Sequence, residues 1–399
     1  MLTSEENFNQ YFANSARETD PRKLADHRRL GIPTGPRPRR WENYHDRFDV
    51  SKEPNEVFRF GWNVEIDPYN PNSVPKKRTA MGRFKHECAT TILSRDNRCV
   101  VYSGDDERFD YVYQFVTEGR VDLNNRAANM DLLDRGTLYV ARFNGDGTGV
   151  WLPLVFGQGP LTAANGWRNQ ADVLIRCRTA ADALAATRMD RPEDVEANPV
   201  TGKVYVLCTN NSNRGVGNNP GVDAANPRPA NRWGQIIEIT EAGGDNAATS
   251  FRWDMFMVCG DPANPAHRTF WAGWRGAVSP IGAPDNCVFD NFGNIWIATD
   301  GMESALGFND ALYACPTEGP KRGRLRMFMS FPNGSEFCGP EFTPDNTTVF
   351  GAVHHSGEGS VLGAARPVSL WPDGHTGPRP AIVAVIKAFG TGSNRIGSR

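Results

Sequence analysis

Acidic residues recur directly beside apolar, strand-like segments along the whole chain. They lie in the motifs SEEN (4–7), FKHE (84–87), SGDD (103–106), RPEDVE (191–196), PDN (284–286) and SGE (356–358). Carboxylates that converge repel one another, and the usual compensation is a hard cation bound through oxygen ligands. If the fold brings these motifs together, the sequence therefore predicts a site for calcium, manganese or ferric iron.

The same motifs also have a structural interpretation, because an Asp beside a strand is commonly a turn former. We interpret Asp290 and Asp345 in this way. The histidines His86, His354 and His355 have two open interpretations, as metal ligands or as hydrogen-bonded groups of the scaffold. The sequence contains no GxSxG nucleophile motif, no Walker phosphate-binding loop and no dinucleotide fingerprint.

The elements that must position these carboxylates follow one recurring pattern, in which a turn rich in Asp, Asn, Pro or Gly precedes a β-prone run. The pattern occurs in SRDNRCVVYSG (94–104), DRGTLYVARF (134–143), NPVTGKVYVLCTNN (198–211), DNFGNIWIATDG (290–301) and TPDNTTVFGAVHH (343–355). Such repetition predicts an all-β protein, either a β-propeller or a β-sandwich. In a propeller, equivalent strand ends meet around a central channel, so the carboxylates would converge there.

Other segments complete the predicted organisation. Short helices are expected over 15–31 and 178–190, as decorations of the sheet. The tract 210–232 is rich in Gly, Asn and Pro and predicts a long inserted loop. We therefore expect one propeller domain over residues 1–399, with short helical insertions and that loop.

Composition excludes several classes of function. The formal net charge of the 399 residues is −2, so no basic field is present to recruit nucleic acid or an anionic membrane. No segment approaches the roughly 18 apolar residues of a membrane span. The polar start MLTSEENFNQYF has no feature of an export signal.

The eight cysteines show no CxxC spacing, so the sequence predicts no zinc cage. We expect mainly buried free thiols, with one isolated disulfide as the alternative.

Read together, several of these strings resemble one known family. They are GRFKHE, SGDDERFDYVYQF, LLDRGTLYVARF, RPEDVEANPVTGKVYVLCTNN, NPRPANRWGQIIEI, PDNCVFDNFGNIWIATDG and GPEFTPD. In this order they resemble the PhoX family of calcium- and iron-dependent alkaline phosphatases over nearly the whole chain. RPEDVEANP followed by a strand is the specific signature, whereas FKHE or SGDD alone is a weak one.

The resemblance implies a six-bladed propeller that hydrolyses small phosphate esters at a metal cluster in its mouth. It also implies a monomer that is exported to the periplasm or secreted. Carried over residue by residue, Glu193 would bind iron and Arg191 would neutralise the phosphate. The calcium ligands implied by the resemblance are Glu87, Asp106, Asp285 and Glu358. Phosphoryl transfer needs such clustered positive charge at the non-bridging oxygens.

The chain departs from the family pattern at three places. The family reads TCEEN where this chain reads LTSEEN, so Ser4 stands where a cysteine thiolate ligates iron. A serine hydroxyl is a much poorer ferric ligand, and we expect the iron position to be weak or empty. The resemblance also begins at this motif, without the family's preceding N-terminal part. Finally, HHSGE stands where the family tends to read QHPGE, with Glu358 kept.

Three functions are compatible with this sequence. The first is a metal-dependent phosphomonoesterase or closely related phosphodiesterase. The second is a calcium-dependent lactonase-like propeller hydrolase, which PDNCVFDNFGNIWIATDG would suit but RPEDVEANP would not. The third is a catalytically impaired or non-enzymatic PhoX-like propeller, favoured by Ser4. Iron plus calcium, calcium alone, or neither in the purified protein would separate them.

Overall fold

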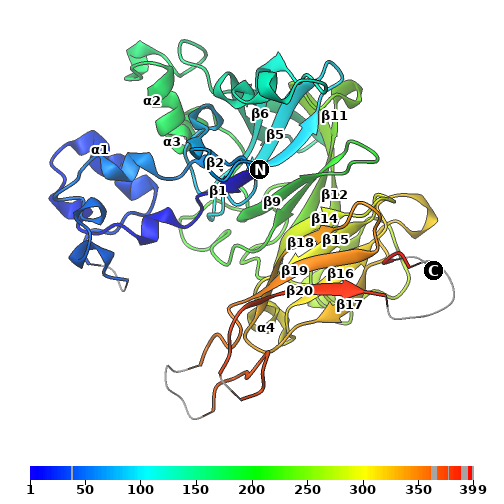
Figure 1. The fold of residues 1–399 in the computed structure, drawn as a ribbon. Coiled ribbons are helices and arrows are strands. Elements are labelled where there is room, and N and C mark those ends of the chain that lie inside the picture. Colours follow the sequence, from blue (N-terminus) through cyan, green and yellow to red (C-terminus); the bar gives the residue numbers. More distant parts are fainter. Residues whose placement is uncertain (37–38, 361–365, 376, 388–393, 398–399) are drawn as a thin grey trace. The chain divides into compact units, whose positions relative to one another are not determined.

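The computed structural model describes residues 1–36, 39–360, 366–375, 377–387 and 394–397, and Figure 1 shows the fold. The chain divides into two units. Unit 1 comprises Met1–Asn144, Thr148–Arg188 and Glu241–Phe251. Unit 2 comprises Gly145–Gly147, Met189–Thr240 and Arg252–Arg399. A single propeller domain over the whole chain stays a prediction.

Unit 1 contains two antiparallel sheets. The smaller sheet consists of β1 (Leu2–Ser4), β2 (Asn63–Glu65) and β3 (Lys76–Lys77). The larger one consists of β4 (Thr90–Leu93), β5 (Arg98–Gly104), β6 (Val112–Arg120), β7 (Gly136–Phe143) and β8 (Thr148–Pro153). Consecutive strands among these five pair with each other, from β4–β5 to β7–β8.

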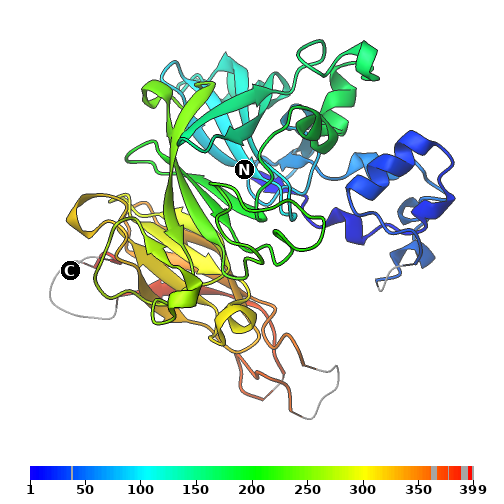
Figure 2. The ribbon, with the colours of Figure 1, turned by 180° about the vertical axis from the view of Figure 1, so that it is seen from behind.

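Three short helices accompany these sheets: α1 (Pro21–Arg29), α2 (Gln170–Ile175) and α3 (Cys177–Ala183). The side chain of Asp20 accepts from the Arg22 N–H at 2.8 Å and so caps α1, which confirms the second half of the helix expected over 15–31. The helix expected over 178–190 ends early, because Ala185 has a φ of 52°. Helices α2 and α3 adjoin each other in both views (Figures 1 and 2).

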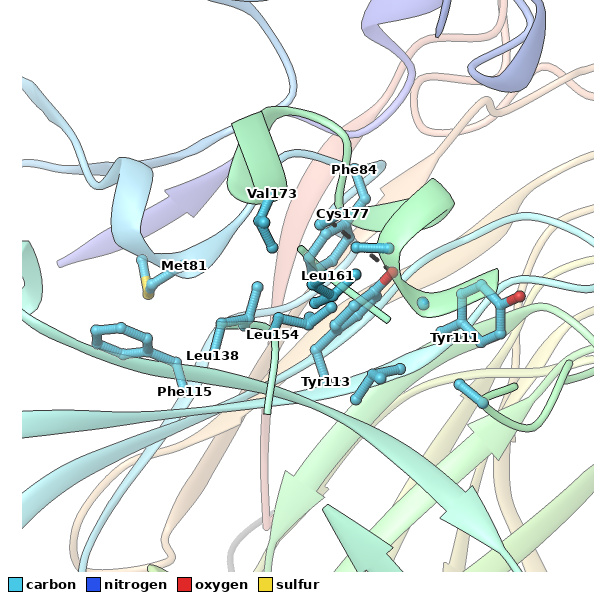
Figure 3. Packing of buried hydrophobic residues seen from close by; sticks show 14 of the residues in the cluster. Met81, Phe84, Tyr111, Tyr113, Phe115, Leu138, Leu154, Leu161, Val173 and Cys177 are labelled. Carbon is cyan, nitrogen blue, oxygen red and sulfur yellow. Dashed lines mark hydrogen bonds between the residues drawn. The ribbon is translucent and has the colours of Figure 1, made fainter. Parts of the chain in front are cut away.

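The core of unit 1 joins the larger sheet to α2 and α3 (Figure 3). The Phe84 ring stacks on Tyr113, with ring centroids 4.1 Å apart, and on His86, with centroids 3.6 Å apart. The Cys177 thiol donates to the Arg83 carbonyl at 3.2 Å. These contacts fix the backbone directly before Glu87. The core therefore determines where the KHE motif lies.

Unit 2 is also built from antiparallel strands. One group consists of β9 (Pro192–Ala197), β10 (Val204–Cys208), β11 (Gln235–Glu241), β12 (Ser250–Val258) and β13 (Phe270–Trp271). Glu241, at the end of β11, and Ser250 and Phe251, at the start of β12, belong to unit 1. A second group consists of β14 (Pro284–Phe289), β15 (Ile295–Thr299), β16 (Ala311–Cys315) and β17 (Arg326–Ser330), with helix α4 (Met302–Leu306) after β15. The third consists of β18 (Glu336–Phe342), β19 (Thr348–His354) and β20 (Ala381–Ile386).

All five predicted turn-and-strand patterns are confirmed, since their β-prone runs form β5, β7, β10, β15 and β19. Asp290 and Asp345 are turn residues as predicted. Asp290 accepts from the Phe292 and Asn294 N–H groups at 2.9 and 3.0 Å, and Asp345 accepts from Thr347 N–H at 3.1 Å.

The fold class predicted from sequence is confirmed as all-β and propeller-like. The sheet β14–β17 is an up-and-down meander in chain order, which is the arrangement of a propeller blade. All eight cysteines are free thiols, and the five at 177, 208, 259, 287 and 315 are buried, as expected. Within the described residues, no helix has both the length and the apolar character needed to cross a membrane.

Candidate metal centre

Three carboxylates of unit 1 face one another. Oxygen atoms of Glu6, Glu87 and Asp106 all lie within 4.8 Å of each other. Glu6 follows β1, Glu87 follows the Phe84 core contact, and Asp106 follows β5. The KHE and GDD segments run antiparallel through a bridge between His86 and Asp105, so Glu87 lies opposite Gly104 and diagonal to Asp106. Two predicted ligands are therefore brought together, along with Glu6.

The neighbours of these carboxylates have structural roles instead. Glu5 accepts from the Gly61 and Trp62 N–H groups at 3.0 and 3.1 Å. Asp105 is fully buried and forms a two-pronged ion pair with Arg178, whose Nε lies 2.7 Å from Asp105 Oδ2. Successive residues of an extended chain point to opposite sides, so Glu5 and Asp105 meet other partners than Glu6 and Asp106 do.

His86 belongs to the scaffold. Its Nδ1 lies 3.0 Å from Asn63 Nδ2 and 2.9 Å from Ser103 Oγ, and its Nε2 lies 2.9 Å from the Gly82 carbonyl. Burial lowers the pKa of His86 to about 3, so the ring is neutral at any physiological pH. Of its two interpretations, the structural one is correct.

Ser4 occupies a structural position on β1. It is paired with Asn63 of β2, and its hydroxyl donates to Asn63 Oδ1 at 2.8 Å. Asn63 in turn contacts His86, which precedes Glu87. The Ser4 hydroxyl is thus the first group of a hydrogen-bonded series, Ser4–Asn63–His86, that leads toward Glu87. It is a neutral hydroxyl and not a charged metal ligand.

Unit 2 brings two more predicted ligands together. Glu193 on β9 and Asp285 on β14 are both buried, and their carboxylate oxygens lie within 4.8 Å of each other. The neighbouring Asp194 points the other way and accepts from the Cys287 N–H at 2.8 Å. That bond ties β9 to β14 and so holds Glu193 beside Asp285.

Arg191 lies beside this pair. Its guanidinium Nη2 is 2.7 Å from Glu193 Oε1, and about a quarter of its side chain is exposed, against 4 % of Glu193. The backbone of Arg191 has a φ of 54°, in the left-handed region that non-glycine residues rarely adopt. Such conformations cost about 1–3 kcal/mol and are retained mainly where the local geometry is needed.

The long loop between β10 and β11 supports the position of Arg191. Residues 209–234 contain no helix or strand, only an isolated bridge between Asn211 and Asn231. Buried Asp190 accepts from Arg214 Nε at 2.8 Å and from Asn231 Nδ2 at 3.1 Å. The loop is therefore anchored to the residue that precedes Arg191, which restricts the start of β9.

Glu358 lies elsewhere in unit 2. It is exposed, and its N–H donates to the Gly334 and His355 carbonyls, each at 2.8 Å. It lines a cavity of about 370 Å³ together with Asp300, Glu303, Asp310 and Glu336, and neither Glu193 nor Asp285 is among the described residues that line it. Its assignment to the same cluster as those two residues stays a prediction.

The sequence did not single out Glu6, because nothing in the SEEN motif distinguishes it from Glu5. It did not single out Glu336 either, which lines the cavity beside Glu358, because strand pairing across the β18–β19 hairpin brings its neighbours to it.

The donor sets fit a hard cation. Each of the groups Glu6–Glu87–Asp106 and Glu193–Asp285 offers only carboxylate oxygens, which suit calcium, and neither contains a cysteine among its described members. The Ser4 hydroxyl, which the resemblance places where the family has a cysteine, is already bonded to Asn63. The residues present therefore fit a hard cation such as calcium.

The all-β, propeller-like fold thus presents buried carboxylates that could bind a metal beside an arginine. The family model described as "Alkaline phosphatase PhoX" matches residues 1–357, and the chain belongs to the PhoX family. Membership of that family supports phosphoester hydrolysis and favours it over lactone hydrolysis.

A solved structure agrees with this assignment. The chain resembles that of Pseudomonas fluorescens PhoX in complex with vanadate, a transition-state analogue. The sequence identity is 39 % and the TM-score 0.85, and the match covers 96 % of this chain and 67 % of that one. Among curated proteins no relative was found.

Proposed function

We propose that this protein is a metal-dependent phosphatase that hydrolyses small phosphate monoesters. The supporting observation is the arrangement of Arg191, Glu193 and Asp285, in which two neighbouring buried carboxylates adjoin a half-buried guanidinium. The similar structure from Pseudomonas fluorescens holds vanadate, so a phosphate-like ligand suits this fold.

In unit 2, Glu193 and Asp285 would hold a cation. In unit 1, Glu6, Glu87 and Asp106 would hold a cation. Glu358 is proposed as a further calcium ligand. When bound, calcium would supply positive charge to the non-bridging oxygens of the phosphoryl group.

Arg191 is proposed to bind the phosphate. A guanidinium presents two parallel N–H groups that match two phosphate oxygens, which an ammonium does not. Its bond to Glu193 holds it toward the metal-binding carboxylates, and the anchored loop behind Asp190 limits its movement. Arg191 would therefore be oriented before the substrate arrives.

Iron is proposed to be weakly held or absent, since Ser4 takes the place of the family's cysteine. The observation that favours this version is the Ser4–Asn63 hydrogen bond, which already gives the hydroxyl a structural role. Calcium would then be the main cofactor, and catalysis slower than in a relative with the thiolate. We further propose that the protein acts as a monomer in the periplasm or outside the cell, as the family resemblance implies.

Hydrolysis of p-nitrophenyl phosphate by Arg191→Lys and Glu193→Gln tests the proposal. Each change removes a charge-assisted contact of about 1.5–3 kcal/mol, so kcat/KM should fall roughly tenfold to a hundredfold. Arg191→Lys should mainly weaken inhibition by inorganic phosphate, while Glu193→Gln should lower bound calcium.

Matched controls are Arg188→Lys, at an arginine paired to Asp182 in unit 1, and Glu196→Gln, three residues further along β9. Both should keep the parent activity. Parent rates in Arg191→Lys and Glu193→Gln would show that the two residues are part of the scaffold and would refute the assignments.

A further inference from the structure

The β18–β19 hairpin of unit 2 gathers a second kind of metal-binding group. Glu336 is directly opposite His354 in the strand pairing. Cys338 lies two residues from Glu336 on the same strand, and therefore on the same face of the sheet. A carboxylate oxygen of Glu336, Cys338 Sγ and a ring nitrogen of His354 lie within 4.8 Å of one another.

The adjacent His355 is turned toward the same group. In a regular strand two successive histidines point to opposite faces, but His355 has a φ of 52°, which ends β19 and redirects its side chain. As a result, Glu336 Oε2 lies 3.1 Å from His355 Nε2 and 3.4 Å from His354 Nδ1. The two imidazole centroids are only 3.8 Å apart.

The surroundings of Glu336 are strongly acidic. It lines the 370 Å³ cavity together with Asp300, Asp310 and Glu358. A cation at this wall would relieve both the burial of charge and the mutual repulsion of the carboxylates. The cavity also gives an ion access from solvent.

We propose that Glu336, Cys338 and His354 bind a divalent transition metal of the zinc type, with His355 as the fourth ligand. A thiolate, two imidazoles and a carboxylate are the donors that zinc prefers, whereas calcium takes oxygen donors alone. The site thus differs in chemistry from the all-carboxylate groups of the proposed hydrolytic centre. It does not depend on the phosphatase proposal.

The absence of CxxC spacing does not argue against this site. That spacing is the sequence signature of a cage built on one local loop. Here two ligands come from β18, the third is the last residue of β19, and the fourth is the residue after it. On binding, the Cys338 thiol gives its proton to the buffer, so metal uptake should release protons at neutral pH.

Cobalt(II) titration of the full-length protein tests the proposal, after chelator treatment and return to calcium-containing buffer. Cobalt bound to a thiolate gives a near-ultraviolet charge-transfer band, which calcium sites cannot produce. We expect one equivalent of cobalt to generate this band and zinc to abolish it by displacement. Cys338→Ser should remove the band, while Cys99→Ser, at a half-buried cysteine of unit 1, should keep it.

His354→Gln provides a second variant that is not at risk of unfolding, because about half of its side chain is exposed. It should weaken cobalt binding roughly tenfold or more, and the matched control His45→Gln should not. The absence of a band in the parent, or its persistence in Cys338→Ser, would overturn the proposal. The histidines would then simply be hydrogen-bond partners of Glu336.

Discussion

The carboxylates of unit 1 lie in two regions that differ in the charge of the neighbouring side chains. In one region, Asp105 and Asp110 face arginines, with Arg178 Nε 2.7 Å from Asp105 and Arg29 Nη1 3.0 Å from Asp110. In the other region, oxygens of Glu6, Glu87 and Asp106 lie within 4.8 Å of one another. The first region contains arginines that compensate its charge, and for the second we expect a gain in stability when a cation is added. The contribution of the Asp105 and Asp110 region to the stability of the fold should therefore be the same with and without metal.

The largest effect is expected from breaking the arginine-compensated region. Arg178→Met keeps much of the side-chain volume but leaves Asp105 buried without its ion-pair partner. Removing one partner of a buried pair costs about 3–5 kcal/mol. Urea unfolding should show this loss equally with and without calcium. Arg188→Met, at an arginine that is about half exposed, should have little effect. Calcium-dependent destabilisation by Arg178→Met would contradict the distinction between the two regions.

A third environment of carboxylates sharpens the comparison. Glu241 is buried and accepts from Tyr102 OH at 2.8 Å and Trp151 Nε1 at 3.1 Å, and burial raises its pKa from 4.5 to about 8. Above about pH 4.5 the unfolded chain releases a proton that the folded protein still holds. The free energy of unfolding should therefore fall as the pH rises from about 4.5 to about 8. The slope should approach roughly 1.4 kcal/mol per pH unit.

Glu241→Gln cannot titrate, so its free energy of unfolding should lack this decline. Chemical denaturation of both proteins between pH 5 and pH 8 measures the difference directly. Parallel pH profiles in the two proteins would mean that Glu241 is ionised in the folded state.

A smaller effect is expected from the carboxylate-facing region. At a hundredfold excess over Kd, a bound ion stabilises the folded state by about 2.7 kcal/mol. Chelation should therefore lower the melting temperature of the parent protein. Glu87→Gln removes one of the repelling charges, so it should stabilise the metal-free protein and destabilise the calcium-loaded one. Glu118→Gln, at an exposed position of β6, should change neither melt. Overlapping parent melts with and without chelator would argue against a cation in this region.

The smallest effect on stability concerns Ser4. Ser4→Ala loses the hydrogen bond to Asn63, which should cost about 1 kcal/mol. Ser4→Cys should cost a similar amount but should raise the iron content, because a thiolate replaces a neutral hydroxyl. Metal analysis of the purified variants checks this expectation. Equal iron content in the parent, Ser4→Ala and Ser4→Cys would show that position 4 is not the family's metal-binding position.

The strands were predictable from sequence because their signals are local. A turn and the β-prone run that follows it lie within a few residues, as in 290–301, so no distant contact is needed to recognise them. The identity of the site residues was only partly predictable. Glu5 and Glu6, or Asp105 and Asp106, are equivalent in sequence, and only the path of the backbone decides which of them faces a carboxylate.

Contacts between residues far apart in the chain could not be predicted either, because they also depend on the path of the backbone. Asn63, which bonds the Ser4 hydroxyl, lies 59 residues away in the chain, and Arg178 lies 73 residues from Asp105. Cys338 and His354 meet only because β18 and β19 pair in one register. The positive φ of Arg191, whose conformation no local glycine signals, was equally hidden.

The most direct measurement is hydrolysis of p-nitrophenyl phosphate by the full-length chain after chelation, followed by titration with calcium alone and with calcium plus ferric iron. We predict that chelation abolishes activity, that calcium alone restores most of it, and that iron adds little while Ser4 is present. Full activity after chelation, or no activity with both metals restored, would contradict a calcium-dependent phosphatase.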